Sequence, residues 1–259
     1  MGETVTLERD GHVLLIGLNR PAKRNAFDRQ MLGELAEAYG VLENDDEIRS
    51  GVLFAHGDHF TGGLDLADVV GDIAANSMSI PENGRDPWRL DGPWATPLVA
   101  AAQGWVMTLG IELLLAADIR IAADDARFTQ YEVRRGIFPF GGATSRFPRE
   151  AGWGNAMRWM LTGAEFDAPE ALRLGLVQEV ADNAITARER AVTIAQEIAN
   201  SAAPLGVRAT LEAAQDGLGQ GIPVADELRS KVAELFATAD AAEGVQSFIE
   251  RRDAVFTGR

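Results

Sequence analysis

The sequence contains no cysteine among its 259 residues and only three histidines. The lack of cysteine excludes disulfide scaffolds, thiolate metal sites and cysteine nucleophiles, and it fits a reducing compartment. The histidines are His12, His56 and His59. His56 and His59 flank a Gly-Asp turn with no third ligand at a suitable spacing, so they are interpreted as loop residues and no metal site is predicted.

Positive charge is scarce, since 24 Lys and Arg residues face 39 Asp and Glu residues, for a formal net charge of −15. This balance argues against nucleic acid or an anionic membrane as a partner, and an anionic small molecule would need a local basic patch. The N-terminal MGETVTLERDG lacks the regions of a signal peptide. Apolar stretches such as Leu98–Ala102 and Leu113–Ala117 are too short to span a bilayer. A cytoplasmic protein is expected.

Strand and helix signals alternate over the first two-thirds of the chain. Asp10-Gly11 is a hairpin signal between two strands, and Asp28 is placed to cap a helix that runs to about Asn44. This alternation predicts an α/β fold with parallel strand pairing. The predicted strands are Thr4–Glu8, Val13–Asn19, Gly51–Ala55, Pro97–Ala102, Ile119–Ala122, Ala126–Thr129 and Val177–Val180, with a short apolar helix at Ile111–Ala117.

Two segments between these elements are predicted to be irregular. The stretch from Val70 to Ala95 is interpreted as a long surface segment with some helix, and such long segments are often functional. Gln103–Gly110 is interpreted as a turn region.

From Gly152 onward the pattern becomes helical, with a boundary near Ser201–Pro204. Residues 1–200 are therefore predicted to form an α/β core that holds the active site, and residues 201–259 a helical C-terminal region. The pattern leaves open whether this tail packs against a partner subunit or only covers its own core. The predicted helices are Asn155–Leu161, Ala168–Leu174, Ala184–Ser201, Leu205–Gln215, Val224–Phe236 and Asp240–Arg252.

The first stretch whose residues suit a role in catalysis is Phe60-Thr61-Gly62-Gly63-Leu64-Asp65, which follows a strand and a loop. Adjacent glycines let the backbone approach a ligand closely, and amides in such a turn can point together at an oxyanion. A plain glycine-rich turn is an equally good interpretation of this stretch alone. It lacks the patterns of phosphate loops and of dinucleotide-binding turns.

The second stretch is Gln103–Leu113, where a glycine-bearing turn opens a helix whose first amides suit an anionic oxygen. Glu112 falls in the first turn of this otherwise apolar helix. A first-turn glutamate is commonly only a favourable partner of the helix dipole. Its apolar flanks nevertheless indicate a buried element, in which a carboxylate needs a partner or a role.

The third stretch is Phe128-Thr129-Gln130-Tyr131-Glu132, followed by Gly136-Ile137-Phe138-Pro139-Phe140-Gly141-Gly142. Arg134 and Arg135 follow Glu132 closely, so an ion pair is the simple structural interpretation of that glutamate. The Pro-Phe-Gly-Gly run predicts a shaped turn before a helix.

Taken in order, these stretches resemble the crotonase (enoyl-CoA hydratase/isomerase) superfamily. The resemblance spans residues 13 to 180, with a tail F-I-E-R-R at Phe248–Arg252. The motifs are N-R-P-x-x-R-N-A, F-T-G-G-L-D-L, P-L-V-A-A-x-Q-G, x-G-x-E-L-L-L-A-A-D-I-R-I-A, A-R-F-T-Q-Y-E-x-x-x-G-I-F-P-x-G-G and L-T-G-x-x-F-x-A-x-E-A-L-x-L-G-L-V-x-E-V. Each piece alone is weak, but the ordered set is highly specific.

The resemblance implies a repeated β-β-α spiral core with a helical trimerisation tail, assembled as a trimer or a dimer of trimers. It implies an oxyanion hole formed by the backbone amides of Leu64 and Leu109 around the thioester carbonyl of an acyl-CoA. Glu112 and Glu132 fall on the positions of the two glutamates with which family hydratases handle one water. No metal and no permanently bound cofactor is implied, since coenzyme A arrives as part of the substrate.

The resemblance also implies a coenzyme A cleft near the first loop, where Arg20, Lys23, Arg24 and Arg29 cluster. A solvated surface patch is the alternative for this cluster, and Arg251 and Arg252 are candidate contributions from a neighbouring subunit. The residues expected to bind substrate or coenzyme A are Lys23, Arg24, Ala26, Gly62, Gly63, Asp65, Leu66, Thr108, Gly110 and Pro139.

The chain departs from the family pattern in the oxyanion turn, where Thr108 and Leu109 replace the usual glycines and Leu64 replaces a frequent alanine. These side chains narrow the permitted backbone dihedrals and are expected to reshape the acyl pocket. Three functions are weighed. The favoured hypothesis is hydration of a 2-enoyl-CoA. The second is another crotonase reaction (isomerisation, thioester hydrolysis or C–C cleavage), and the third is a catalytically silent homologue that binds acyl-CoA.

Overall fold

A computed structural model describes residues 3–75, 79–90, 92, 94–220, 232, 234, 235 and 237–259. Its centre is a six-stranded sheet of order β1-β2-β3-β4-β6-β9. β1 and β2 pair antiparallel, and the remaining neighbours pair parallel, as the alternation of strands and helices predicts. The strands are β1 (Val5–Asp10), β2 (Val13–Leu18), β3 (Ser50–Ala55), β4 (Leu98–Ala102), β6 (Ile119–Ala123) and β9 (Glu179–Ala181).

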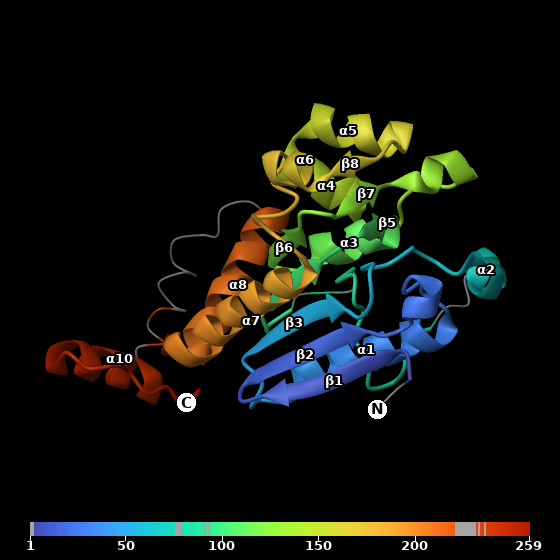
Figure 1. Cartoon of the computed structure of the whole chain (residues 1–259). Coiled ribbons are helices and arrows are strands. Elements are labelled where there is room, and N and C mark those ends of the chain that lie inside the picture. Colours follow the sequence, from blue (N-terminus) through green and yellow to red (C-terminus); the bar gives the residue numbers. More distant parts are fainter. Residues whose placement is uncertain are drawn as a thin grey trace.

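Helices cover both faces of this sheet (Figure 1). α7 (Ala184–Ser201) packs against β3, β4 and β6, and it buries one alanine in every turn, at 187, 191, 195 and 199. On the other face, α1 (Arg29–Asn44) and α3 (Leu109–Ala116) belong to the larger core cluster. The side chain of Asp28 caps α1 by accepting from Met31 N at 2.9 Å, as predicted.

A second, three-stranded sheet of order β5-β7-β8 lies beside the first. Its strands are β5 (Trp105–Met107), β7 (Arg127–Thr129) and β8 (Phe166–Asp167). The prediction of a turn over residues 103–110 is therefore wrong for β5, and α3 begins at Leu109, two residues earlier than expected. α4 (Ala143–Ala151), α5 (Trp153–Thr162) and α6 (Ala168–Arg173) complete this part, and α4 follows the predicted Gly-Gly turn.

The segment between α2 (Leu66–Ala75) and β4 is not simply a surface segment, because Trp88 and Trp94 are buried in the main core. Residues 76–78, 91 and 93 of this stretch lie outside the described residues. Indole rings bury large apolar areas, which outweighs the turn-rich composition around them.

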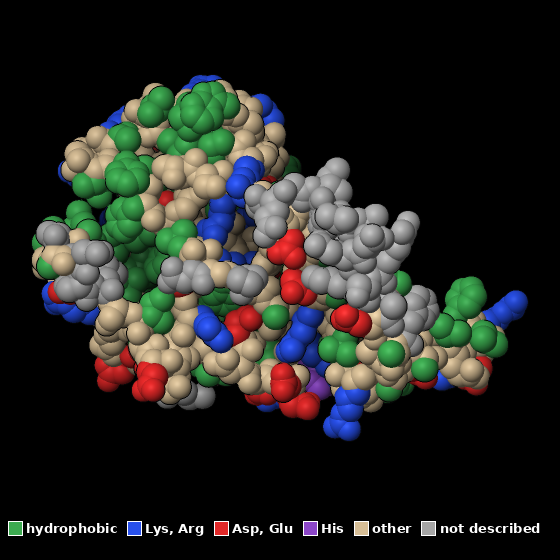
Figure 2. All heavy atoms as spheres, turned by 180° about the vertical axis from the view of Figure 1, so that it is seen from behind, with side chains coloured by type: hydrophobic (Ala, Val, Ile, Leu, Met, Phe, Trp, Pro, Cys, Tyr) green, Lys and Arg blue, Asp and Glu red, His purple; other side chains and the backbone are tan. Residues whose placement is uncertain are grey.

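The C-terminal region contains α8 (Pro204–Gln220), which follows α7 in the chain, and α10 (Ala239–Glu250), which stands away from the body of the molecule (Figure 1). Most of the predicted helix Val224–Phe236 lies outside the described residues. Seen from behind, the body is hollowed, with hydrophobic side chains along one side of the hollow and basic side chains near its middle (Figure 2). Among the described helices, none has the length and apolar character required to cross a bilayer.

Candidate active site

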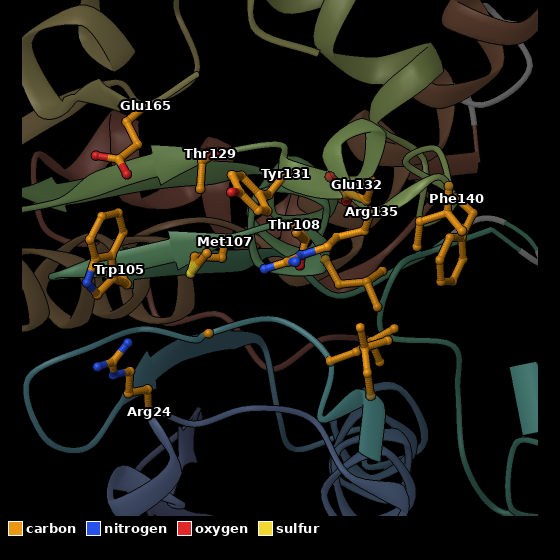
Figure 3. Close-up of a pocket in the computed structure, with 15 residues that line it drawn as sticks. Arg24, Trp105, Met107, Thr108, Thr129, Tyr131, Glu132, Arg135, Phe140 and Glu165 are labelled. Carbon is orange, nitrogen blue, oxygen red and sulfur yellow. The ribbon is translucent and has the colours of Figure 1, made fainter. Parts of the chain in front are cut away.

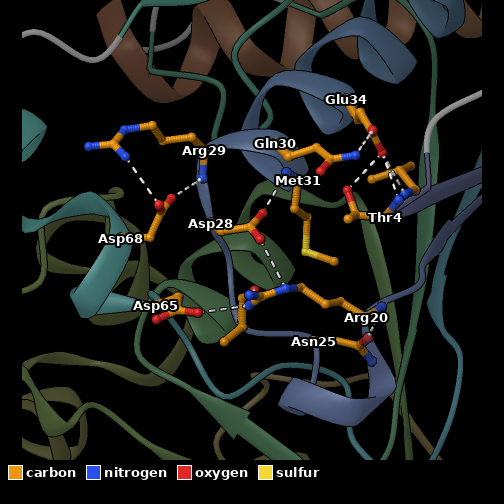
Figure 4. A network of polar contacts seen from close by, with 12 residues as sticks. Thr4, Arg20, Asn25, Asp28, Arg29, Gln30, Met31, Glu34, Asp65 and Asp68 are labelled. Atoms are coloured by element: carbon orange, nitrogen blue, oxygen red, sulfur yellow. Dashed lines mark hydrogen bonds and ion pairs between the residues drawn. The ribbon is translucent and has the colours of Figure 1, made fainter.

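Two of the four basic residues near the first loop are held in ion pairs by their own chain. Arg20 Nε lies 2.9 Å from Asp28, and Arg20 Nη1 lies 2.9 Å from Asp65 (Figure 4). Arg29 pairs with Asp68 at 3.1 Å and also with Asp72. Because these two arginines are neutralised by their own chain, they are poor candidates for binding coenzyme A phosphates.

The turn after β3 is fixed between this loop and β5. Gly62 N donates to Arg24 O at 2.7 Å and Phe27 N donates to Gly63 O at 2.8 Å, while Asp65 N donates back to Phe27 O at 2.9 Å. Leu64 N lies between these bonds and makes no hydrogen bond to the described residues.

A second unpaired amide opens α3. Thr108 N donates to Thr129 O at 2.8 Å, and Thr108 O accepts from Ile111 N at 2.9 Å. Leu109 N is the first N–H of the helix, so it has no partner within the helix, and it has none among the other described residues. The side chains of Leu64 and Leu109 line one cavity of about 450 Å³.

Glu112 is completely buried in α3 and does not act as a simple first-turn carboxylate. Its Oε1 accepts from Gly141 N at 2.8 Å and from Ala143 N at 2.9 Å. Its Oε2 makes no hydrogen bond within the described chain. Burial raises the pKa of Glu112 to about 7, against the opposing effect of the two backbone donors.

Glu132 lies in the 3-10 turn η2 (Tyr131–Arg135) and is 4% exposed. Burial raises its pKa to about 8, and the nearby charge of Glu112 adds to the rise. No ion pair joins Glu132 to Arg134 or Arg135, whose guanidinium groups instead lie over the Tyr131 ring at 5.4 and 5.1 Å. The ion-pair interpretation of Glu132 is therefore not supported.

Gln130 is a buried partner of Glu132 that the sequence did not single out. In the amide orientation that satisfies both of its polar atoms, Gln130 Nε2 donates to Glu132 Oε1 and Oε2 at 3.0 and 3.1 Å. The same nitrogen lies 3.2 Å from Thr108 O. Gln130 thus links the Glu132 carboxyl group to the turn that presents the Leu109 amide.

Gly141 is a second residue that the sequence did not assign to the site. A Cβ added there would lie 2.6 Å from Leu109 Cδ2, 2.8 Å from Glu112 Oε2 and 2.9 Å from Trp88 Cδ1. The lack of a side chain at this position lets the backbone amide reach Glu112. Glu112 itself does not line the cavity, whereas Leu109, whose Cδ2 lies near the same hypothetical Cβ as Glu112 Oε2, does line it.

The cavity has a polar end and an apolar end (Figure 3). Arg24, Trp105 and Glu165 lie toward one end, and Phe140 lies at the other. Arg135 and Tyr131 project into the middle, near Thr108. The apolar lining residues are Leu64, Leu66, Trp105, Met107, Leu109, Ile137 and Phe140.

The structure brings only part of the predicted set to this cavity. Of the candidate substrate-binding residues, Lys23, Ala26, Gly63, Asp65, Gly110 and Pro139 do not line it. Asp65 pairs with Arg20, and a Cβ on Gly110 would lie 2.3 Å from Thr61 Cγ2, so these two have evident structural roles. The lining members are Arg24, Gly62, Leu64, Leu66, Thr108, Leu109 and Glu132.

The histidines behave as loop residues. His56 Nε2 lies 2.8 Å from Thr6 Oγ1, and His59 Nδ1 accepts from Trp105 N at 3.2 Å. Within the part of the chain that the structure describes, no group of three or more His, Cys, Asp or Glu side chains is arranged to hold a metal ion.

Comparison with known proteins agrees with the fold. The family model for enoyl-CoA hydratase/isomerase matches residues 8–259. A Mycobacterium bovis protein described as a probable enoyl-CoA hydratase is 35% identical, with 99% of each chain covered. The short-chain-enoyl-CoA hydratase of Clostridium acetobutylicum is 33% identical over 96% of this chain and 95% of its own.

Solved structures show the same fold. A crystal structure of a probable enoyl-CoA hydratase/isomerase from Mycobacterium abscessus has 54% sequence identity and a TM-score of 0.97, and each chain is covered completely. With this match over the whole length and the family model over nearly all of it, the chain belongs to the enoyl-CoA hydratase/isomerase family, whose fold is the crotonase fold.

Proposed function

We propose that this protein hydrates a 2-enoyl-CoA to the corresponding 3-hydroxyacyl-CoA, with Glu112 and Glu132 as the acid–base pair. The observation that supports this most strongly is a cavity lined by Leu64, Leu109 and Glu132, which brings two unpaired backbone amides close to one buried carboxyl group with a raised pKa. Glu112, the second buried carboxyl group with a raised pKa, does not line the cavity, but its Oε2 and Leu109 Cδ2 both lie within 3 Å of the position that a Gly141 Cβ would take. Addition of water to a conjugated thioester needs a base, an acid and a sink for negative charge. This site offers a group for each requirement.

Glu112 serves as the base in this proposal. Its pKa, near 7, is the lower of the two, and the Gly141 and Ala143 amides stabilise its ionised form. Its second oxygen has no partner in the described chain and so can accept a hydrogen bond from water. Glu112 removes a proton from that water while the water oxygen bonds to the β-carbon. Because Leu109 lines the cavity and Glu112 does not, the Leu109 side chain has to move for the water held by Glu112 to meet the β-carbon.

Glu132 serves as the acid. With a pKa of about 8, it keeps its proton at neutral pH and can donate it to the α-carbon. The double-bond electrons move first toward the thioester oxygen, forming an enolate, and then form the new C–H bond. The product has gained one water, and the two carboxyl groups have exchanged protonation states. Proton exchange with solvent restores the starting state.

The amides of Leu64 and Leu109 hold the enolate oxygen. Both are fixed before the substrate arrives, because the neighbouring peptide groups are already hydrogen-bonded. Such fixed donors need no reorganisation in the transition state, and loss of one donor in comparable sites lowers the rate about 100-fold or more.

Arg24 is the proposed contact for the coenzyme A phosphates, because it lines the polar end of the cavity and no ion pair to the described residues neutralises it. The apolar end accommodates an apolar acyl group. The name of the Clostridium relative supports a short one. No cofactor besides the coenzyme A moiety of the substrate is part of the proposal.

Residues 201–259 are proposed to mediate assembly into a trimer or a dimer of trimers. Phe248, Ile249 and Val255 are 84%, 67% and 73% exposed on or beside α10, a set of apolar side chains that a second copy would cover. Light scattering should give the mass of three or six chains, and a monomer would contradict the proposal.

The function is tested by following the loss of enoyl-thioester absorbance with the wild-type protein and two variants, Glu112→Gln and Glu132→Gln. We expect turnover by the wild type and a collapse of the rate in each variant, with unchanged circular dichroism. Chromatography of the products separates hydration from isomerisation and hydrolysis. Normal turnover by either variant would remove that glutamate from the mechanism.

A further inference from the structure

Thr108 has a backbone conformation that is unfavourable for a β-branched residue. Its φ is 52° and its ψ is −119°, in a region that glycine enters easily and other residues rarely. Holding a non-glycine residue in such a region costs about 1–3 kcal/mol. A threonine at this position therefore lowers the stability of the folded protein.

The side chain of Thr108 faces the active-site cavity and contacts the opposite oxyanion segment. Thr108 lines the cavity, and its Oγ1 fills the space where a side chain of Gly63 would begin, 2.1 Å from the position of an added Cβ. The peptide after Gly63 bears the Leu64 amide, and the peptide after Thr108 bears the Leu109 amide. The hydroxyl thus lies where the two amide-bearing segments meet.

This hydroxyl is free to donate. Thr108 Oγ1 makes no hydrogen bond to any described residue, whereas the hydroxyl of Thr129, on the neighbouring strand, donates to Gly163 O at 3.2 Å. The backbone groups of Thr108 are already engaged by Thr129 O and by Ile111 N. This free hydroxyl is a third donor, placed between the segments that carry the two free amides, and all three residues line the same cavity.

We infer that the Thr108 hydroxyl is a further catalytic group, donating a third hydrogen bond to the thioester oxygen as it becomes an enolate. This inference rests on the proposed hydratase function and adds a donor to its oxyanion site. No bond to Thr108 forms or breaks, and the hydroxyl keeps its proton throughout. Because charge on the oxygen grows toward the transition state, the contribution falls mainly on kcat rather than on KM.

The test separates the hydroxyl from the shape of the side chain. Thr108→Val removes the hydroxyl and keeps the branched shape, Thr108→Ser keeps the hydroxyl and removes the methyl group, and Thr108→Ala removes both with less backbone strain. Thr193→Val is the matched control, because the Thr193 hydroxyl donates to Glu189 O on α7, away from the cavity. Thermal unfolding of each variant establishes that it is folded.

We expect Thr108→Val and Thr108→Ala to lower kcat about 10- to 100-fold with a small change in KM, somewhat less than the loss of a main oxyanion donor. Thr108→Ser should retain most of the rate, and Thr193→Val should match the wild type. Equal kcat values for the wild type and both hydroxyl-free variants would overturn the inference, as would an effect confined to KM.

A binding measurement distinguishes failure of this inference from failure of the proposed function. Acetoacetyl-CoA forms an enolate whose absorbance reports stabilisation of a charged thioester oxygen without turnover. The wild type and Thr108→Ser should enrich the bound enolate, and Thr108→Val should do so less. If the wild type hydrates no enoyl-CoA, the proposed function fails, and the absorbance alone then decides the role of the hydroxyl.

Discussion

Replacing Glu112 with glutamine should make the protein more stable at alkaline pH while removing its activity. The pKa of Glu112 rises from 4.5 to about 7 on folding because burial disfavours the charged form. The folded state therefore binds more protons than the unfolded state between these values. The free energy of unfolding falls as pH rises through this window, and the loss is complete above pH 7.

The magnitude follows from the pKa difference. At about 1.4 kcal/mol for each pKa unit, keeping Glu112 ionised and buried costs on the order of 3 kcal/mol above pH 7. Glutamine has no charge, and its carbonyl oxygen can still accept from the Gly141 and Ala143 amides. The side-chain NH2 group of the glutamine would take the place of Oε2, which has no hydrogen-bond partner in the described chain. An NH2 group without an acceptor there costs about 1 kcal/mol. The net gain above pH 8 is about 2 kcal/mol.

Urea unfolding of the wild type and Glu112→Gln at pH 5 and pH 8.5 measures this difference. We expect equal or slightly lower stability of the variant at pH 5 and higher stability at pH 8.5. The matched control is Glu37→Gln, since Glu37 is exposed on α1 and its substitution should show no such change with pH. A stability difference for Glu112→Gln that is the same at both pH values would refute the reasoning.

Three further predictions follow from the site. The pH profile of kcat/KM should be narrow, because the rate falls below about pH 7 as Glu112 gains a proton and above about pH 8 as Glu132 loses its proton. A flat profile from pH 6 to 9 would contradict these two roles. Gly141→Ala should lose activity and about 1–3 kcal/mol of stability, because three side-chain atoms lie within 3.0 Å of the added Cβ. The control Gly33→Ala, which has open space around it in α1, should stay active and gain up to about 1 kcal/mol of stability, as measured by urea unfolding. Gln130→Met should raise the pKa of Glu132, because it removes a hydrogen-bond donor to the charged carboxylate. The alkaline limb of the kcat/KM profile should therefore move to higher pH, and an unchanged limb would exclude the hydrogen bond between Gln130 and Glu132.

Local signals in the sequence predicted much of the fold. The Asp28 cap and the hairpin at Gly11 depend on residues close in the chain, and both are found as expected. β5 was missed because it has only three residues, and its pairing with β7 brings together residues about 22 positions apart. The stretch from Val70 to Ala95 is predicted to be a surface segment because its composition is that of a loop, and only the tertiary structure shows that Trp88 within it is buried and donates from Nε1 to Leu109 O at 3.0 Å.

The candidate site was predictable to the extent that it follows ordered motifs. These motifs singled out Glu112, Glu132 and the amides of Leu64 and Leu109. Local pattern alone indicated only that Glu112 is buried, and it left Glu132 as an ion-pair partner of Arg134 and Arg135. The contribution of Gln130 could not be predicted, because its role depends on the orientation of a buried amide. The strain at Thr108 was anticipated only as a narrowing of the permitted dihedrals.

Isotope labelling tests the central claim most directly. The wild-type protein is incubated with a 2-enoyl-CoA in H₂¹⁸O, and in D₂O in a parallel reaction, and the products are analysed by mass spectrometry. Our account predicts a 3-hydroxyacyl-CoA with solvent oxygen at the β-carbon and solvent hydrogen at the α-carbon, and it predicts that Glu112→Gln and Glu132→Gln form almost none. An unlabelled isomer, a free acid released from coenzyme A, or labelled product formed equally by the variants would contradict it.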